Sequence, residues 1–283
     1  MATIYLDHNV IANIAGIPAA ADAPQVGANV TALQARGHRF VLSAWNMYEL
    51  ARSNDQQHID QCCAFVETLN PLWLSDSTKV KRQEVDRFLQ PAFDNVGPVR
   101  NRNFSAFNET VAAMWASYGE GGRHDETFTS SVASLRARPE FLETVDNSAK
   151  ETPEAILIGR RAFRNGGEKL LDGIVDREYL ALSLPAGAGS QQLKFLIANR
   201  NKLLSVSPAL AVEDAMSKLR VRDSFKPEPA DAADLQHAMV ALGYCDHFVT
   251  GDRQLAQHCS SVVRKLGFPC HVCRKVSDIP VND

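Results

Sequence analysis

The N-terminal part of the chain alternates short apolar runs with amphipathic stretches. Residues Thr3 to Leu6 are apolar and β-prone, which predicts a strand, and the apolar spacing after Asp7 predicts a helix. Arg39 to Ser43 predicts a second strand, and a further helix is predicted from Ala44 to about Arg52. Strand, turn and helix therefore follow one another twice.

The C-terminal part has the same order. A helix is predicted from Pro229 to about Leu242, followed by a buried strand at His247 to Thr250. Asp252 begins another predicted helix that runs to Leu266, and Cys270 to Val276 predicts a last strand. Strands and helices that alternate with short connections are typical of a mostly parallel sheet with helices on both faces.

Between Pro71 and Lys226 the pattern changes to helical stretches interrupted by glycine and proline, with hardly any strand. The predicted helices are Lys79 to Gln90, Phe104 to Tyr118, Pro139 to Ala149, Pro153 to Phe163 and Leu210 to Arg222. We therefore predict an α/β protein. Its three-layer, Rossmann-like core is formed by residues 1–70 and 227–283, and residues 71–226 form an inserted helical subdomain.

The composition excludes some classes of protein but does not indicate a function. The 283 residues are 45% hydrophobic and 22% charged, as in globular proteins, and a net charge of -3 gives no overall attraction to a polyanion. The sequence has no secretory signal and no apolar run of about eighteen residues. We expect a cytoplasmic protein that does not enter a membrane and whose six cysteines are free thiols.

Four acidic residues lie near the ends of predicted strands. Asp7 follows the first strand, and Glu49 lies on the helix after the second. Asp252 follows the strand that ends at Thr250, and Asp234 lies in the first turn of the helix before it. Ligands of a parallel sheet collect at the carboxyl ends of its strands, where the strand order reverses. We expect the four carboxyl groups to share one pocket, about 3 to 8 Å apart.

Converging carboxylates are typical ligands of hard divalent cations. Mg²⁺ and Mn²⁺ bind carboxylate oxygens and keep waters that the oxygens of a phosphodiester can replace. Two such ions about 4 Å apart activate a water and stabilise the leaving oxygen. Because four close carboxylates repel one another, we expect the cluster to need a cation. The pattern predicts metal-dependent hydrolysis of phosphodiesters.

The residues around these acids resemble the motifs of PIN-domain nucleases. Ile4–Ile11 (IYLDHNVI) resembles the opening motif, a strand ending in Asp with Asn two residues later. Val41–Leu50 (VLSAWNMYEL) looks like the second motif, in which a strand leads to a helix that presents Glu. Asp234–Gly243 (DLQHAMVALG) and Asp246–Asp252 (DHFVTGD) are similar to the third and fourth motifs. The resemblance covers roughly residues 2–70 and 228–276.

The resemblance implies a metal-dependent ribonuclease that uses Mg²⁺ or Mn²⁺ held by Asp7, Glu49, Asp234 and Asp252. RNA is the expected substrate, and DNA stays open as an alternative. The insertion is longer than in compact toxin members of the family, which suggests a lid, a substrate-gripping arm or a partner surface. An antitoxin, another protein partner and a homodimer all stay open.

Several of these residues also have a purely structural interpretation. Asn9 and Asp252 suit helix N-caps, and Glu49 can pair with Arg52. We assign Asn9 and Thr250 supporting roles beside the metal ligands.

Two neighbouring acids begin the helix of the third motif. Asp231 and Asp234 form a D-x-x-D pair, in which we assign helix capping to Asp231 and metal binding to Asp234. His237 lies three residues further on, where it can either approach the site or pack in the core. A zinc site at Cys270 and Cys273 is disfavoured, because a strand would point their sulfurs to opposite faces.

The acidic site itself repels a polyanion, so phosphate contacts are expected elsewhere. The stretch from Lys150 to Lys226 carries thirteen Lys and Arg against nine Asp and Glu. The predicted nucleic-acid contacts are Arg160, Arg161, Arg164, Arg220 and Arg222, on a helical body beside the mouth of the site. The alternatives are a solvated helical face paired with nearby glutamates, and a dimer surface.

Two rival functions remain. A PIN-like scaffold would bind RNA or a protein without cleaving it. A phosphotransferase or phosphatase would use Asp7 as a nucleophile, but such enzymes usually need a second Asp two residues later, where this chain has Asn9.

Overall fold

The computed structural model describes the chain except for residues 17–22, 94–104, 120–125, 186 and 281–283. Its centre is a six-stranded sheet in the order β4-β3-β2-β1-β5-β6, which is parallel except for β4. The strands are β1 (Thr3–Leu6), β2 (Arg39–Leu42), β3 (Leu72–Leu74), β4 (Phe107–Asn108), β5 (His247–Val249) and β6 (His271–Cys273). The prediction of an α/β fold with a mostly parallel sheet is confirmed.

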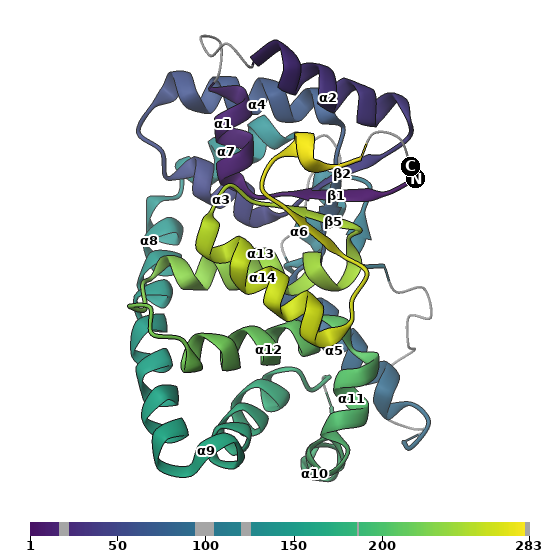
Figure 1. The fold of residues 1–283 in the computed structure, drawn as a ribbon, viewed down its shortest axis with the longest axis vertical. Helices are drawn as coiled ribbons and strands as arrows, with labels where there is room; N and C mark the ends of the chain where they lie inside the picture. The colour runs from purple at the N-terminus through teal and green to yellow at the C-terminus, as the bar shows by residue number, and fades with distance from the viewer. Residues whose placement is uncertain (17–22, 94–104, 120–125, 186, 281–283) are drawn as a thin grey trace.

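Helices lie on both sides of this sheet (Figure 1). Those before residue 140 are α1 (His8–Ala15), α2 (Ala23–Ala35), α3 (Ala44–Ala51), α4 (Gln56–Leu69), α5 (Ser77–Leu89), α6 (Val111–Ser117), α7 (Phe128–Arg136) and α8 (Pro139–Lys150). Those that follow are α9 (Thr152–Leu182), α10 (Ser190–Ala198), α11 (Arg200–Val206), α12 (Pro208–Arg222), α13 (Ala230–Tyr244) and α14 (Arg253–Leu266). A short 3-10 helix, η1 (Val276–Asp278), ends the described chain.

The strand order reverses between β1 and β5. From β1 the chain builds outward through β2 and β3, and it returns much later to place β5 on the other side of β1. The backbone N–H of Asp7, directly after β1, donates to the carbonyl of Val249 at 3.0 Å. This is the topological switch point at which parallel sheets bind ligands.

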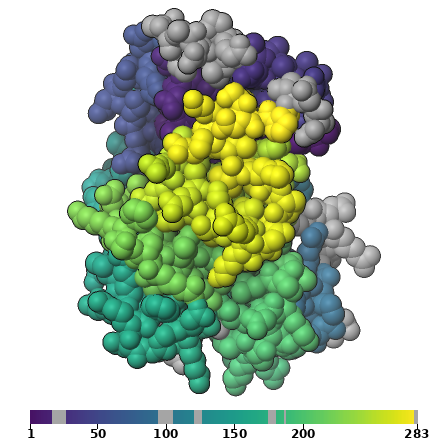
Figure 2. Space-filling model, viewed as in Figure 1, coloured from purple at the N-terminus to yellow at the C-terminus, as the bar shows by residue number. Residues whose placement is uncertain are grey.

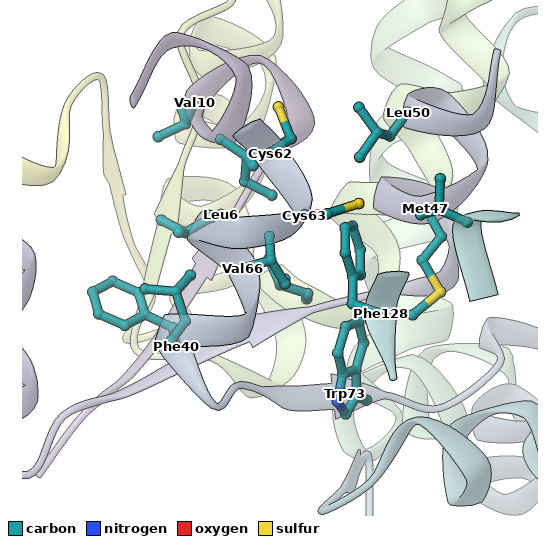
Figure 3. Close-up of a cluster of buried hydrophobic side chains, with 14 of the residues drawn as sticks. Leu6, Val10, Phe40, Met47, Leu50, Cys62, Cys63, Val66, Trp73 and Phe128 are labelled. Atoms are coloured by element: carbon teal, nitrogen blue, oxygen red, sulfur yellow. The ribbon is translucent and has the colours of Figure 1, made fainter. Parts of the chain in front are cut away.

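Alternate strand residues point into two separate cores. Leu6 and Phe40 belong to the first core, which includes Val66 of α4 and Phe128 of α7 (Figure 3). The intervening Tyr5 belongs to the second core, on the opposite face of the sheet, with residues of α12, α13 and α14. The strands are therefore buried on both faces, as the alternation of β and α elements predicts.

The region predicted as a helical insertion contributes two strands. Leu72–Leu74 forms β3, and residues 107–108 pair with it as β4, so the predicted helix from Phe104 to Tyr118 is wrong in its first half. Phe104 itself lies outside the described residues. The Asn108 side chain donates to the Trp73 carbonyl at 3.3 Å, which favours the extended pairing. Thr110 then accepts the N–H of Ala113 at 3.1 Å and begins α6.

The later helices of that region divide into two groups. Helix α12 packs in the second core through Val212 and Met216 against α13. Helices α9, α10 and α11 form the far end of the molecule, beyond α12 (Figure 1). In the space-filling view the C-terminal segment occupies the middle of the visible face, between the N-terminal helices and this far end (Figure 2). No helix among the described residues combines the length and apolarity needed to cross a membrane.

A buried glutamate joins α5 to α12 and α13. Glu84 is 4% exposed, and its carboxylate accepts the N–H groups of Ala209 and Leu210 at 2.8 and 3.1 Å. It also accepts the hydroxyl of Tyr244 at 2.7 Å. Burial raises the pKa of Glu84 to about 7, although these donors oppose the shift.

The raised pKa of Glu84 predicts a pH dependence of stability. A carboxyl group with a raised pKa stabilises the fold below its unfolded pKa, near 4.5, and this contribution is lost as the pH rises through 7. Between pH 4.5 and 8 the wild type should lose about 3 kcal/mol of unfolding free energy relative to Glu84→Gln. Urea unfolding measures this, with Glu109→Gln at an exposed position as the control. Parallel pH profiles of Glu84→Gln and wild type would contradict the prediction.

Candidate metal centre

The Asp7 carboxylate is held in one orientation at the carboxyl end of β1. Asp7 is 4% exposed, and its Oδ1 accepts the N–H of His8 at 2.7 Å as the N-cap of α1. Its Oδ2 accepts Asn9 Nδ2 at 2.7 Å and Thr250 Oγ1 at 2.6 Å. Because Oδ2 receives two donors, Oδ1 is the oxygen that faces the remaining polar groups, with His237 Nε2 at 3.8 Å.

Asn9 and Thr250 also join the end of β1 to the loop after β5. Asn9 Oδ1 accepts the N–H of Gly251 at 2.6 Å, and Thr250 Oγ1 accepts the N–H of Asp252 at 3.1 Å. A Cβ atom at Gly251 would lie 2.9 Å from Asn9 Oδ1, so a larger residue there would displace the Asn9 side chain. These are the contacts expected of the supporting roles assigned to Asn9 and Thr250.

His237 occupies the centre of the acidic cluster. It is 1% exposed, its Nδ1 is hydrogen-bonded to the Tyr5 hydroxyl, and its Nε2 lies 2.9 Å from Glu49 Oε2. One ligand atom each from Asp7, Glu49 and His237 fall within 4.8 Å of one another. In the described part of the chain this is the one set of three His, Cys, Asp or Glu side chains arranged to hold a metal ion.

The electrostatics of the three groups are coupled. Burial works to lower the pKa of His237, but Glu49 and then Asp7 outweigh it and raise the pKa to about 9. Burial alone would raise the pKa of Glu49, but the facing His237 brings it below its ordinary value. The pKa of Asp7 is raised by burial, against the influence of His237. A protonated His237 therefore balances the two carboxylates.

This balance corrects one expectation. The sequence suggested that the clustered acids need a bound cation because they repel one another. The structure instead places two cationic side chains, His237 and Arg220, among the acids. The chain therefore supplies positive charge of its own to the site.

Asp234 lies one helical turn before His237 on α13. Its Oδ2 is 3.2 Å from Arg220 Nη2, and burial raises its pKa to about 7, against the opposing effect of Arg220. The charges of Asp7 and Asp252 add to the rise, which places all three carboxylates in one electrostatic environment. Asp234 thus borders the group formed by Asp7, Glu49 and His237.

Asp252 is exposed at the edge of the site. It is the N-cap of α14, and its Oδ1 accepts the N–H of Leu255 at 2.7 Å. Asp252 therefore caps α14, as its structural interpretation predicts. Its other oxygen, Oδ2, takes no part in this cap and could bind a ligand. Its charge still reaches Asp234.

The capping role assigned to Asp231 needs correction. The N-cap residue of α13 is Pro229, and Asp231 lies in the first turn. One oxygen of Asp231 accepts the N–H of Glu228 at 2.8 Å, while the other is paired with Arg220. Asp231 therefore fixes Arg220 beside Asp234 rather than acting as the cap itself.

Two of the arginines predicted to contact nucleic acid have internal partners, one of them half-buried and the other buried. Arg160 donates to Asp223 Oδ1 and the Phe225 carbonyl at 2.7 Å each, and Arg220 is 4% exposed between two aspartates. Their contacts hold α9, α12 and α13 together, so the guanidinium of each is engaged within the protein rather than presented to a phosphate. Arg222 is paired with Glu168 and lies over the ring of Phe163, as expected for a solvated helical face.

Arg161 and Arg164 are exposed on α9. Of the five arginines predicted to contact nucleic acid, these two are exposed and could reach the phosphates of a polyanion.

Two further alternatives are resolved. Arg52 pairs with Asp146 at 3.0 Å, while Glu49 contacts His237. Cys270 packs in the second core and Cys273 in the first, so their sulfurs lie on opposite faces of the sheet, as the strand pattern predicts.

His237 is the functional candidate that the sequence did not assign to the cluster. The available signal was its spacing of three residues from Asp234, which places both on one face of a helix. A histidine that only packs in the core could have the same spacing from Asp234. The sequence alone therefore cannot show that His237 belongs to the cluster, because this depends on its contact with Glu49. No family model, curated protein or solved structure matches this chain.

Proposed function

We propose that this protein is a divalent-metal-dependent nuclease with a PIN-like core that hydrolyses RNA. The observation that carries the proposal is the convergence of Asp7, Glu49 and His237 at the sheet's switch point. Asp234 and Asp252 border the same group. The buried Asp7 carboxylate, oriented by neighbouring side chains, and the half-buried Glu49 beside it are suited to a metal ion and a phosphate group.

The donor set fits Mn²⁺ better than Mg²⁺. Mg²⁺ strongly prefers oxygen, whereas Mn²⁺ accepts carboxylate oxygen and imidazole nitrogen together. Asp7, Glu49 and His237 offer two such oxygens and one such nitrogen. Because a histidine must lose its proton to bind a metal, the raised pKa of His237 makes ion binding weaker at low pH. A bound ion would polarise the phosphodiester and lower the pKa of a water.

The protein side chains hold the site in place for this chemistry. Asn9 and Thr250 orient the Asp7 carboxylate, and Gly251 allows Asn9 to approach. Asp234, with a pKa near 7, is partly protonated at neutral pH and suits the acceptance of a proton from an attacking water. Arg220 fixes the position of its carboxylate.

A metal-dependence assay tests the proposal. Single-stranded RNA should be cleaved in Mn²⁺, more slowly in Mg²⁺, and not in EDTA. Asp7→Asn should reduce cleavage by at least about 100-fold, because it removes a charged ligand that no neighbour replaces. Asp60→Asn, an exposed aspartate on α4, is the matched control and should keep full activity. Undiminished cleavage by Asp7→Asn would exclude this site as the catalytic centre.

The second candidate is a PIN-like scaffold that binds RNA or a protein without cleaving it. The observation that favours it is the internal neutralisation of the acids by His237 and Arg220, which lets the cluster exist without a metal. Calorimetric titration of metal-free protein with Mn²⁺ separates the two. Binding that Asp7→Asn abolishes agrees with the nuclease, whereas neither binding nor cleavage agrees with the scaffold.

A further inference from the structure

An aromatic pocket is lined in part by helix α3, the helix that also carries Glu49 of the metal-binding group. It has a volume of about 70 Å³, and its walls include Trp45 and Tyr48 of α3, Trp115 and Tyr118 at the end of α6, and Phe141 and Val145 of α8. Its lining is almost entirely apolar. It lies in the wall of the first core, where α3, α6, α7 and α8 meet.

The pocket and the metal-binding group share helix α3. Trp45 and Glu49 are four residues apart, so their side chains lie on the same face of the helix, with Cβ atoms roughly 6 Å apart. Tyr48, which directly precedes Glu49, is close enough for the Glu49 charge to act on it. A group that enters the pocket therefore lies about one helical turn from a ligand bound at Glu49.

The walls of the pocket are fixed before any ligand arrives. The rings of Trp45 and Tyr48 pack edge to face, with centroids 5.3 Å apart. The Tyr48 hydroxyl donates to Asp146 at 2.7 Å, and Arg52 pairs with the same carboxylate and lies over the Tyr48 ring. On the opposite side the indole N–H of Trp115 donates to Ser131 at 3.1 Å. Fixed aromatic walls lower the entropy cost of binding a flat group.

Size and chemistry select the ligand. An apolar cavity of roughly 150 Å³ holds a whole benzene ring, so a pocket of about 70 Å³ admits the edge of an aromatic ring while the rest of the ring stays outside its mouth. Water gains little in an apolar lining, whereas an aromatic ring gains contacts with the rings of the lining. Trp45, Tyr118 and Phe141 are each partly exposed, so the pocket is open to solvent on one side.

We propose that this pocket receives the edge of one unpaired nucleobase of a single-stranded RNA whose phosphodiester lies at the metal-binding group. The proposal rests on the proposed nuclease function, and it defines the substrate as unpaired at that position. A base can enter a pocket only when it is unstacked, which duplex RNA does not allow. Aromatic stacking is tolerant of base identity, so the pocket gives strand selectivity rather than a sequence code.

Binding in EDTA tests the pocket without cleavage. The probes are a fluorescent six-nucleotide single-stranded RNA, the same RNA with an abasic ribose at each position in turn, and a duplex of the same sequence. The wild type should bind the single strand at least about ten-fold more tightly than the duplex. One abasic position should cost about ten-fold in affinity, and the others should cost little.

Three variants place the effect in the pocket. Trp45→Ala should weaken binding about ten-fold and remove the penalty of the abasic position, whereas Trp45→Phe should retain most of the affinity. Val145→Phe fills the pocket and should lose the same affinity while remaining folded by circular dichroism. Leu182→Ala, which removes an apolar side chain that is 66% exposed on α9, is the control and should bind as wild type.

The outcomes separate this inference from the nuclease proposal. Mn²⁺-dependent cleavage with unchanged RNA affinity in Trp45→Ala and Val145→Phe would overturn the base pocket and leave the nuclease standing. RNA binding that depends on the pocket, with no cleavage in Mn²⁺, would overturn the nuclease and leave the base pocket standing. Equal affinity for duplex and single strand, or no RNA binding by the wild type, would also overturn the base pocket.

Discussion

His237→Ala should lower the free energy of unfolding by about 3–5 kcal/mol at pH 7 in metal-free buffer, which is the cost of breaking a buried ion pair. The substitution removes the cation that lies 2.9 Å from Glu49 and 3.8 Å from Asp7, and leaves the buried Asp7 carboxylate and the half-buried Glu49 carboxylate without it. Urea unfolding measures the loss. Mn²⁺ should restore part of the stability, because a bound cation replaces the lost charge.

The pH dependence gives an independent test of the same charge. A histidine with a raised pKa stabilises the fold fully below its unfolded pKa, near 6.5, and this contribution is lost as the pH rises through 9. The wild type should therefore lose about 3 kcal/mol between pH 6.5 and 9.5, and His237→Ala should not.

A second buried histidine supplies the control for this profile. His258 is 4% exposed beside Asp223, and burial lowers its pKa, so its stabilising effect is lost as the pH falls rather than as it rises. His258→Ala should keep the wild-type loss between pH 6.5 and 9.5. A flat wild-type profile over that range, or equal profiles for wild type and His237→Ala, would show that His237 is not the balancing charge.

The sequence predicted the site best where local pattern and topology agree. Asp7 follows a four-residue apolar strand, and Glu49 lies on the helix that begins directly after β2. A parallel sheet brings Asp7 and Glu49 to the carboxyl ends of its strands, whatever the conformation of the loops between them. Their convergence could be expected without knowing any side-chain contact.

Charge state could not be predicted in the same way. Whether His237 is a cation depends on Glu49, which is 188 residues away in the sequence. The same holds for Arg220, which looked like a solvated residue of a basic helix. Its burial depends on Asp231 and Asp234 of another helix, and spacing along α12 does not reveal them.

The position of α12 was hidden by its polar residues. Glu213 and Lys218 are both buried, at 5% and 7% exposure, which is unusual for such residues. Each has a distant partner: Lys81 of α5 lies 2.7 Å from Glu213, and Asp172 of α9 lies 2.5 Å from Lys218. A helix whose polar side chains are paired internally has the sequence pattern of an exposed helix. For this reason a core element was predicted as part of a separate insertion.

Arg220→Ala should be about as destabilising as His237→Ala, by about 3–5 kcal/mol, because it leaves Asp231 and Asp234 without their shared partner. Arg222→Ala on the same helix is the matched control. Arg222 is 35% exposed and paired with Glu168, so its loss should cost less than about 1 kcal/mol. Combining Arg220→Ala with Asp231→Ala should recover part of the loss, since one buried unpaired charge is removed.

The same substitution separates a structural from a catalytic role of Asp234. Arg220 opposes the rise in the pKa of Asp234, so its removal should move that pKa above 7. If Asp234 accepts a proton during cleavage, the acidic limb of the rate profile of Arg220→Ala should shift to higher pH, while Arg222→Ala keeps the wild-type profile. An unshifted profile with the expected loss of stability would leave Arg220 as a clamp between α12 and α13 and would remove Asp234 from the proton transfer.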